Sequence, residues 1–384
     1  MRARERAILF VLTNSALNRG MNTGLENLAW GLAQRGVRVH ILAGGEQPGY
    51  HNYYIPDAVS YHFTGWSGKN PTSFLSRFED IVRDYGIDVV VGWIINTALL
   101  ANSPSAEGIR FVANLGQMPP KSVPLLSLKW ALLRRMGALE AFRLNASIRK
   151  YPSIADAVVS ISSAVQSTSV QKYSLKKNKC QIIPRGVDTN IFSFGRPNEN
   201  VYSPVKILFA GNIQDAKGVG DLVRALCLVR TPVALRLCGR GKDGYILQLR
   251  EALRETPHKI EYMGPVYQRE LVKFYQQSDI FTFPSHSEGL GKALLEAMSC
   301  GCPVISSDIP VFKEVVQHGQ NGLMVPVRAP QILAGAIEEL IADRALRERC
   351  SVNARKTIEE RFSKKLEIDQ WMKVLDFGSD FEYN

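Results

Sequence analysis

Short, unbroken apolar runs recur along this chain and alternate with segments of helical periodicity. The first run covers residues 7–12, and Leu25, Leu28, Ala29 and Leu32 follow it at helical spacing. Strands without polar alternation are typical of parallel sheets that helices cover on both faces. The alternation therefore predicts an α/β fold. Further strands of the first half are expected at residues 37–42, 87–91, 110–115, 157–161 and 181–183.

The same pattern starts again in the second half. Residues 187–203 are rich in Asp, Asn, Pro, Gly and Ser, which is typical of a linker. A chain of 384 residues is also too long for one ordinary core. We therefore expect two domains, residues 1–190 and 200–362. Strands of the second domain are expected at residues 205–210, 233–238, 259–263, 280–283 and 304–306.

Composition argues against a membrane-spanning chain and against a disulfide scaffold. The longest apolar stretch, residues 89–101, is interrupted by polar residues and is shorter than the roughly 20 residues of a membrane span. The six cysteines form no CxxC pair and lie mostly in apolar contexts. We expect a cytoplasmic protein with reduced thiols.

The basic charge is concentrated in the first half of the chain. There are 47 Lys and Arg against 36 Asp and Glu, a net charge of +11. Residues 1–190 hold 22 of the basic and 12 of the acidic residues, a difference of +10, which leaves +1 for the remainder. Such asymmetry suggests that one half meets an anionic partner: nucleic acid, a lipid surface or an acidic substrate.

Residues 284–301 carry the strongest functional signal. A strand ends there, a polar loop with Glu288, Gly289 and Gly291 follows, and a helix that carries Glu296 starts near Gly291. Ligands of parallel sheets bind at the carboxyl ends of the strands, and helix N-termini attract anions. Two carboxylates at this spacing suit hydroxyls at opposite ends of a diphosphate-linked ligand. The same residues also fit an ordinary helix with one glutamate at its start and one exposed in its middle.

In this window the chain resembles the retaining glycosyltransferases of family 4, which have the GT-B fold. The family signature is a pair of glutamates in an E-G-[FL]-G-x-x-x-x-E-A-M context, which Glu288 and Glu296 match. The resemblance implies two Rossmann-like domains that face each other across a cleft, with a helix in residues 363–384 packing back on the N-terminal domain. Further matches lie at residues 184–188, 209–211, 217–218, 303–305 and 321–326.

The resemblance also implies roles for individual residues. Glu288 would contact the transferred sugar and Glu296 the ribose hydroxyls. Lys217 would neutralise the donor diphosphate, where charge develops on the leaving group. Catalytic roles thus fall to Glu288 and Lys217. Backbone N–H groups are expected to bind the sugar and the β-phosphate at Gly289, Leu290 and Gly291.

One donor-binding position departs from the family pattern. The arginine that commonly accompanies the lysine is replaced by Asn212, so one phosphate charge is missing. Arg185 and Lys292 are candidates to supply that charge. The departure also keeps open a module that binds nucleotide sugars without turnover.

The match is weaker in the first half. Gly20 and Gly24 lie in the loop that corresponds to the family's Gly-rich first turn, which lies against donor and acceptor. The family often has a histidine at the end of a later strand, and Leu115 occupies that position here, with Gln117 nearby.

A second glycine motif offers a different interpretation. Gly239, Gly241 and Gly244 fit G-x-G-x-x-G between a strand and a helix, which alone suggests a dinucleotide site. The motif follows the second strand of its domain and not the first, and a nicotinamide enzyme would leave Glu288 and Lys217 without a role. The resemblance to family 4 implies instead that this glycine turn lies at the border of the donor cleft.

Neither a metal nor a cofactor is expected, because the nucleotide sugar is a co-substrate. No Asp-x-Asp pair is present to bridge a divalent ion to a diphosphate, and no Cys/His cluster has zinc spacing.

A local concentration of basic residues lies in the first half. Residues 121–150 hold seven basic side chains against one acidic, with large apolar residues between them. This segment fits a solvated helix, and it also fits a membrane surface or an anionic acceptor. No nucleic-acid motif accompanies the charge, so nucleic acid is not expected as a partner.

The resemblance and the charge together predict a metal-independent, retaining hexosyltransferase. It would use UDP- or GDP-sugar and a hydroxyl of a lipid-linked or glycan acceptor, in cell-surface glycan or glycolipid synthesis. We expect it in the cytoplasm, with an anionic membrane surface at the inner face as a further partner. The alternatives are a nucleotide-sugar epimerase or hydrolase on the same fold, and a non-catalytic binding module.

Overall fold

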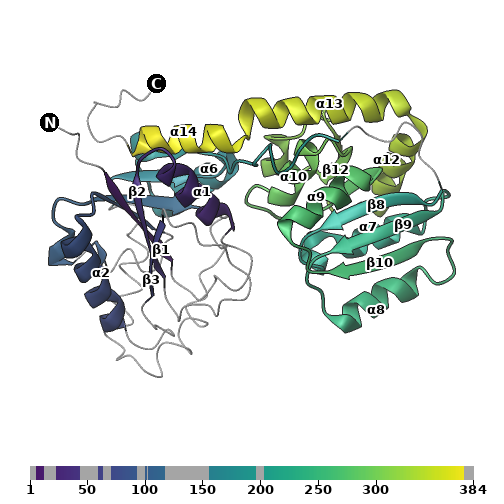
Figure 1. Cartoon of the computed structure of the whole chain (residues 1–384). Helices are drawn as coiled ribbons and strands as arrows, with labels where there is room; N and C mark the ends of the chain where they lie inside the picture. Colours follow the sequence, from purple (N-terminus) through teal and green to yellow (C-terminus); the bar gives the residue numbers. More distant parts are fainter. Residues whose placement is uncertain are drawn as a thin grey trace. The chain divides into compact units, whose positions relative to one another are not determined.

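The computed structural model describes residues 6–12, 23–43, 59–63, 71–92, 100–101, 103–116, 155–195 and 203–375. Contacts divide the chain into unit 1, residues 1–183 and 368–384, and unit 2, residues 184–367. Each unit has its own sheet, as Figure 1 shows. The division falls at residue 183 and not at 190, because the start of the expected linker packs with unit 2. In that segment Phe192 is fully buried, and Val187 forms a bridge with Ser363.

The sheet of unit 1 has seven parallel strands in the order β3-β2-β1-β4-β5-β6-β7. The chain starts in the middle, at β1, and the order reverses between β1 and β4. The strands are β1 (Ala7–Leu12), β2 (Arg38–Ala43), β3 (Val59–Phe63), β4 (Val89–Gly92), β5 (Arg110–Leu115), β6 (Ala157–Ser160) and β7 (Cys180–Ile182).

Helices connect these strands, as the alternation predicts. In α2, Phe74, Phe78 and Ile81 are buried at helical spacing. The helices are α1 (Thr23–Ala33), α2 (Pro71–Tyr85) and α6 (Ser163–Tyr173), with 3₁₀ turns η2 (Pro104–Ala106) and η3 (Lys177–Lys179).

The last helix, α14 (Lys364–Val374), completes the core of unit 1. Ile368 and Trp371 are buried in the same cluster as Ile8 and Phe10 of β1. Gly31 of α1 makes this approach possible, since a Cβ there would lie 2.2 Å from Cδ1 of Ile368. The first residues of α14, up to residue 367, belong to unit 2.

The sheet of unit 2 has six parallel strands in the order β10-β9-β8-β11-β12-β13. The chain again starts in the middle and reverses between β8 and β11, which is the point where ligands bind to open parallel sheets. The strands are β8 (Val205–Ala210), β9 (Val233–Cys238), β10 (Lys259–Gly264), β11 (Ile280–Phe283), β12 (Val304–Ser307) and β13 (Leu323–Val325).

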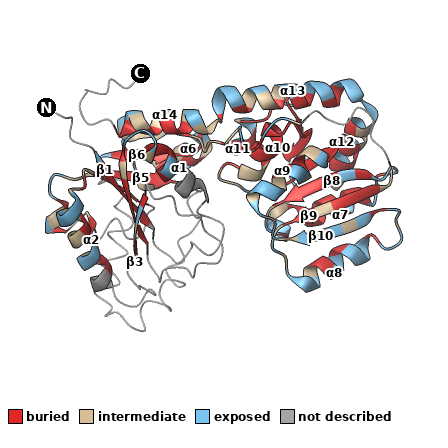
Figure 2. Ribbon diagram, in the orientation of Figure 1, coloured by how far each residue is buried: buried red, intermediate tan, exposed pale blue. Residues whose placement is uncertain are grey.

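The helices of unit 2 form two groups, one for each face of its sheet. Helix α7 packs against α8 and α12, whereas α10 packs against α9 and α13. Figure 2 shows β8 and β9 mostly buried and the outer helix faces exposed, whereas the edge strand β10 has exposed and half-buried positions. The helices are α7 (Val219–Leu226), α8 (Asp243–Ala252), α9 (Gln268–Gln277), α10 (Lys292–Ser299), α11 (Pro310–Lys313), α12 (Pro330–Ala342) and α13 (Arg344–Arg361), with a 3₁₀ turn η4 (Asp215–Lys217).

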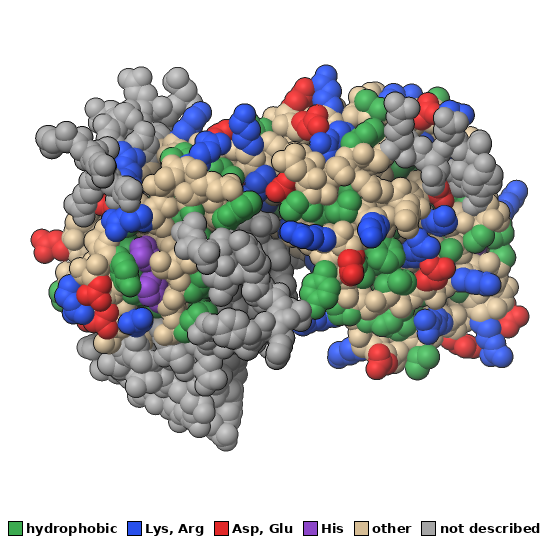
Figure 3. Space-filling model, in the orientation of Figure 1, with side chains coloured by type: hydrophobic (Ala, Val, Ile, Leu, Met, Phe, Trp, Pro, Cys, Tyr) green, Lys and Arg blue, Asp and Glu red, His purple; other side chains and the backbone are tan. Residues whose placement is uncertain are grey.

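Figure 3 shows basic and acidic side chains interspersed over the visible face of unit 2. The basic segment 121–150 lies outside the described residues. Among the helices that are described, none combines the length and apolar character needed to cross a membrane.

Candidate active site

Two loops meet where the strand order of unit 2 reverses. One loop follows β8 and carries Asn212 and the turn η4 with Lys217, and the other follows β11 and carries Glu288. Lys217 ends the 3₁₀ turn, and α7 starts only at Val219 because Gly218 between them is left-handed, with φ +71°.

Backbone contacts hold these two loops together. The N–H of His286 donates to the carbonyl of Ala216 at 3.1 Å. A Cβ on Gly218 would lie 2.0 Å from the carbonyl oxygen of Pro284, so only glycine fits at this contact. The close approach brings the turn that carries Lys217 against the loop that carries Glu288.

Lys217 and Glu288 form an ion pair at this junction. Nζ of Lys217 donates to Oε1 of Glu288 at 2.5 Å, and the two side chains are 22% and 13% exposed. The hydroxyl of Ser285 donates to the same carboxylate oxygen at 3.0 Å. Oε1 thus has two donors from the protein, which fixes the orientation of this carboxylate.

A histidine that no sequence motif indicated supports the loop. Nε2 of His286 lies 2.6 Å from Oδ2 of Asp221, a buried carboxylate on α7 that also pairs with Arg224. The hydroxyl of Ser307 on β12 donates to the carbonyl of Ser285 at 2.5 Å. These contacts join residues that are far apart in the sequence, so no short motif predicts them and they become visible only in the folded structure.

Glu296 lies on α10, and it is buried. Its residue is 5% exposed, which contradicts the interpretation as an exposed glutamate in mid-helix. The hydroxyl of Tyr275 donates to Oε2 at 3.2 Å, and Nζ of Lys292 lies 3.4 Å from Oε1. Burial raises the pKa of this carboxyl, and the neighbouring Lys292 and Tyr275 oppose that shift.

The loop before α10 ends at Gly291, which is itself buried. Gly291 is the N-cap residue in left-handed conformation, with φ +79°, and a Cβ there would lie 2.5 Å from the Phe312 ring. Leu290 is 4% exposed, so its side chain belongs to the core and only its backbone is left for a ligand. Gly289 lies between Glu288 and Leu290 in the same loop.

The two candidates for the missing phosphate charge both have acidic neighbours. Lys292 pairs with Glu296, as described above. Arg185 lies near Glu367, whose carboxylate raises the pKa of the guanidinium while burial, the larger effect, lowers it. Asn212 is exposed on the surface of unit 2.

Of the four positions predicted in the first half of the chain, the structure describes Leu115 and Gly24. Leu115 is 2% exposed at the end of β5, so it is a core residue. Gly24 lies in the first turn of α1. Gly20 and Gln117 lie outside the described residues.

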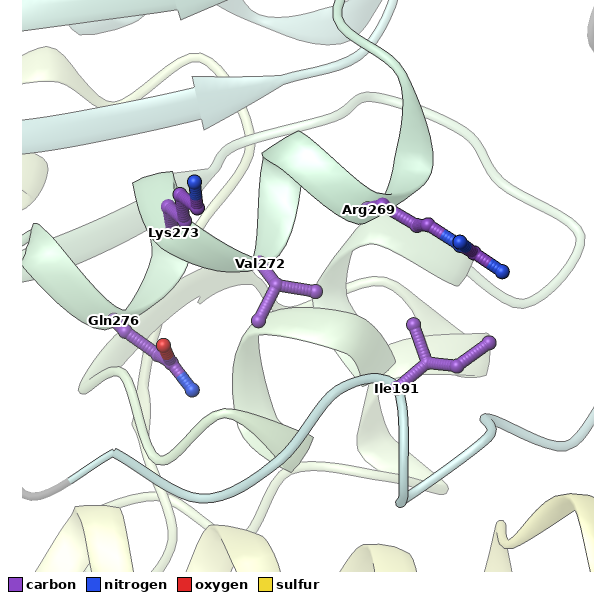
Figure 4. A pocket seen from close by; sticks show the side chains of 5 residues that line it. All are labelled: Ile191, Arg269, Val272, Lys273 and Gln276. Atoms are coloured by element: carbon purple, nitrogen blue, oxygen red, sulfur yellow. The ribbon is translucent and has the colours of Figure 1, made fainter.

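The described part of unit 2 has cavities on its surface, of which two are described below. The first, about 390 Å³, lies along α9 and contains none of the predicted site residues (Figure 4). The second, about 530 Å³, lies at the carboxyl ends of β8 and β9 and includes Asn212. The first cavity is lined by Ile191, Arg269, Val272, Lys273 and Gln276.

Among the described residues, no group of three or more His, Cys, Asp or Glu side chains is arranged to hold a metal ion.

Both halves of the chain match known family models. The model for Glycosyltransferase Family 4 matches residues 18–191, and the model for Glycosyl transferases group 1 matches residues 194–357. A D-inositol 3-phosphate glycosyltransferase of Xylanimonas cellulosilytica is 30% identical over 219 residues, 52% of each chain. One of Pseudarthrobacter chlorophenolicus is 27% identical over 357 residues, 85% of this chain and 83% of the relative. The chain spans about half the length of the first curated relatives it matches.

Solved structures share the fold over nearly the whole chain. A glycosyltransferase from Rickettsia africae has a TM-score of 0.74 at 18% identity, covering 97% of this chain and 98% of that one. Anabaena HepE, in complex with UDP and glucose, has a TM-score of 0.72 at 20% identity, covering 97% and 99%. These similarities confirm the predicted α/β fold of the GT-B type.

Proposed function

The chain belongs to the GT-B glycosyltransferases of the family 4 type, and from this premise we propose that it transfers a hexose-type sugar from UDP- or GDP-sugar to a hydroxyl group. The anomeric configuration is retained. The acceptor is a lipid-linked sugar or a glycan in cell-surface synthesis.

The observation that carries this proposal is the ion pair of Lys217 with Glu288 at the reversal of strand order in unit 2. When the sugar leaves, negative charge builds up on the β-phosphate. A fixed ammonium group close to that phosphate stabilises the transition state, and such electrostatic stabilisation is usually the largest single catalytic effect. Glu288 then faces the sugar, where its second oxygen, Oε2, accepts hydrogen bonds from hydroxyls.

Glu296 binds the ribose of the donor. A carboxylate that is buried and already holds Tyr275 and Lys292 is fixed in place before the donor binds. Carboxylates accept hydrogen bonds from vicinal hydroxyls, which suits the ribose. N–H groups between Gly289 and Gly291 bind the sugar and the β-phosphate next to the start of α10.

The reaction balances without a protein base. The bond between the anomeric carbon and the phosphate oxygen breaks, and the bond to the acceptor oxygen forms on the same face of the sugar. The acceptor proton passes to the leaving diphosphate. No metal is needed, because Lys217 and the backbone N–H groups oppose the developing charge.

The acceptor is inferred from the distribution of charge. Residues 1–190 carry +10 of the net +11, so the half that does not bind the donor is the basic one. An anionic acceptor or an anionic membrane surface fits such a surface. The name of the curated relatives, D-inositol 3-phosphate glycosyltransferase, supports a phosphorylated acceptor in this class of protein.

The test begins with the donor. Thermal shift with UDP-, GDP- and ADP-sugars should raise the Tm with one base only, and that donor is then incubated with candidate acceptors while NMR follows the anomeric configuration. Transfer with retention supports the proposal. Release or epimerisation of the sugar without any acceptor favours a hydrolase or epimerase, and donor binding without sugar release favours a binding module. Sedimentation with liposomes that contain or lack anionic lipid tests the membrane partner.

A further inference from the structure

A cavity lies beside the turn η4, whose last residue is Lys217 of the ion pair with Glu288. It has a volume of about 530 Å³, within the range of small-molecule pockets, and it lies at the carboxyl ends of β8 and β9. The turn η4 connects the two features, since Asp215 at its start lines the cavity and Lys217 at its end binds Glu288. The lining residues are Asn212, Ile213, Gln214, Asp215, Arg240, Gly241, Lys242 and Tyr245.

The loop that carries Arg240 is held rigidly against the loop after β8. A Cβ on Gly239 would lie 1.8 Å from the carbonyl oxygen of Gly211, so the two strand ends meet backbone to backbone. The N–H of Ile213 donates to the carbonyl of Arg240 at 2.7 Å, and the N–H of Gly241 donates to the Tyr262 hydroxyl at 3.2 Å. The backbone on both sides of the Arg240 side chain is therefore fixed.

The side chains that line this cavity carry an excess of positive charge. Lys217 and Lys292 pair with Glu288 and Glu296. In the part of the chain that the structure describes, neither Arg240 nor Lys242 has an ion-pair partner, and both are exposed at the cavity. Asp215 is the acidic side chain of the lining, so two cations face one carboxylate there.

We propose that this cavity binds a phosphate group of the nucleotide-sugar donor and that Arg240 is a second side-chain contact of the diphosphate besides Lys217, with Lys242 adding charge. A guanidinium presents two parallel donors to a phosphate, which a lysine cannot do. Arg240 thereby supplies the charge that Asn212 leaves missing, in place of Arg185 or Lys292. This inference rests on the proposed donor, and it turns the G-x-G-x-x-G motif into a phosphate-binding loop of a glycosyltransferase.

The experiment compares ligands with and without phosphates. Wild type, Arg240→Gln and the control Arg250→Gln, an exposed arginine on α8, are titrated with UDP and GDP by calorimetry. Uridine and guanosine are titrated by ligand-observed NMR. We expect Arg240→Gln to weaken the preferred diphosphate about tenfold or more, because it removes a charge-assisted contact. The nucleoside should bind all three proteins alike.

A second substitution tests the location of the charge. Because Asn212 lines the same cavity, Asn212→Arg in the Arg240→Gln protein should restore diphosphate affinity. Equal affinities of Arg240→Gln and Arg250→Gln for the diphosphate would overturn the inference while leaving the proposed function intact. An equal loss for nucleoside and diphosphate would also overturn it. A wild-type protein that binds neither UDP nor GDP would instead contradict the proposed function.

Discussion

Lys217 and Glu288 are 71 positions apart in the sequence, yet Nζ of one lies 2.5 Å from Oε1 of the other. The contact exists because β8 and β11 are neighbours in the sheet although two strands and three helices separate them along the chain. A cation and a carboxylate are thereby held at the one place where an open parallel sheet leaves its strand ends free for a ligand.

Replacement of Lys217 should affect turnover far more than folding. Lys217→Met removes the cation that opposes charge on the leaving phosphate, so kcat should fall about 100-fold or more. Lys259→Met, at an exposed position of β10, is the control and should keep wild-type activity. Steady-state kinetics with the selected donor provide the measurement, and a wild-type kcat in Lys217→Met would refute the assigned role.

Gly218 should tolerate no side chain. Gly218→Ala places a Cβ 2.0 Å from the Pro284 carbonyl at φ +71°, so we expect a loss of about 2 kcal/mol or more in the free energy of unfolding, together with lost activity. Gly244→Ala is the matched control, because nothing lies within 4 Å of its Cβ and it sits in α8. That helical substitution should stabilise by about 0.5–1 kcal/mol. Urea denaturation distinguishes the two, and equal stabilities would contradict the packing described.

Tyr275 should set the pH range of donor binding. Burial raises the pKa of Glu296, and the Tyr275 hydrogen bond counteracts that shift. Tyr275→Phe therefore raises the pKa further, and the carboxylate needed for the ribose is lost at a higher pH than in wild type. As the pH falls from about 8 to about 5, nucleotide titrations should show Tyr275→Phe losing affinity at a higher pH than wild type. Each unit of pKa shift corresponds to about 1.36 kcal/mol of binding free energy. Superimposable pH profiles would exclude this function of the hydrogen bond.

The stability of unit 1 should depend on pH through a histidine pair. Nδ1 of His40 lies 3.1 Å from Nε2 of His62, and both residues are buried. Burial lowers the pKa of His40 to about 4, with His62 and Arg38 adding to the effect, and burial followed by Arg77 lowers the pKa of His62. The folded state thus binds protons more weakly than the unfolded chain, whose histidines titrate near 6.5. Stability is complete above about pH 6.5 and is lost as the pH falls toward 4.

The measurement compares urea unfolding of wild type and His40→Gln at pH 7 and pH 5. The decrease in stability between the two pH values should be smaller in His40→Gln, because one buried titrating group is gone. His318→Gln changes an exposed histidine of unit 2 and should leave the decrease as it is in wild type. An unchanged decrease in His40→Gln would mean that other groups control the acid sensitivity.

Much of the fold was predictable because buried parallel strands are continuous apolar runs. The predicted strands 110–115, 205–210, 233–238 and 280–283 have the bounds that the structure gives to β5, β8, β9 and β11. The strands β3 and β13 were not predicted. Both lie at a sheet edge, and β3 mixes buried positions with the exposed Ser60. A strand that is half exposed lacks the unbroken apolar signal.

The site was predictable only in part for a related reason. Glu288 and Glu296 belong to one short linear motif, so the sequence alone identified them. The contacts of His286 with Asp221 and of Gly211 with Gly239 join separate strand ends, and no spacing along the chain encodes them. Arg240 was likewise assigned to a glycine motif at the cleft border, and its neighbours around the cavity became evident only from the sheet order.

The most direct test of the donor site is the affinity of Glu296→Ala for the nucleotide sugar selected by thermal shift. Calorimetric titration should give a Kd about tenfold or more weaker than wild type, because the ribose loses its carboxylate partner. Glu270→Ala, an exposed glutamate on α9, should bind as wild type does. Unchanged affinity and unchanged turnover in Glu296→Ala would contradict the account, because the ribose would then be bound elsewhere.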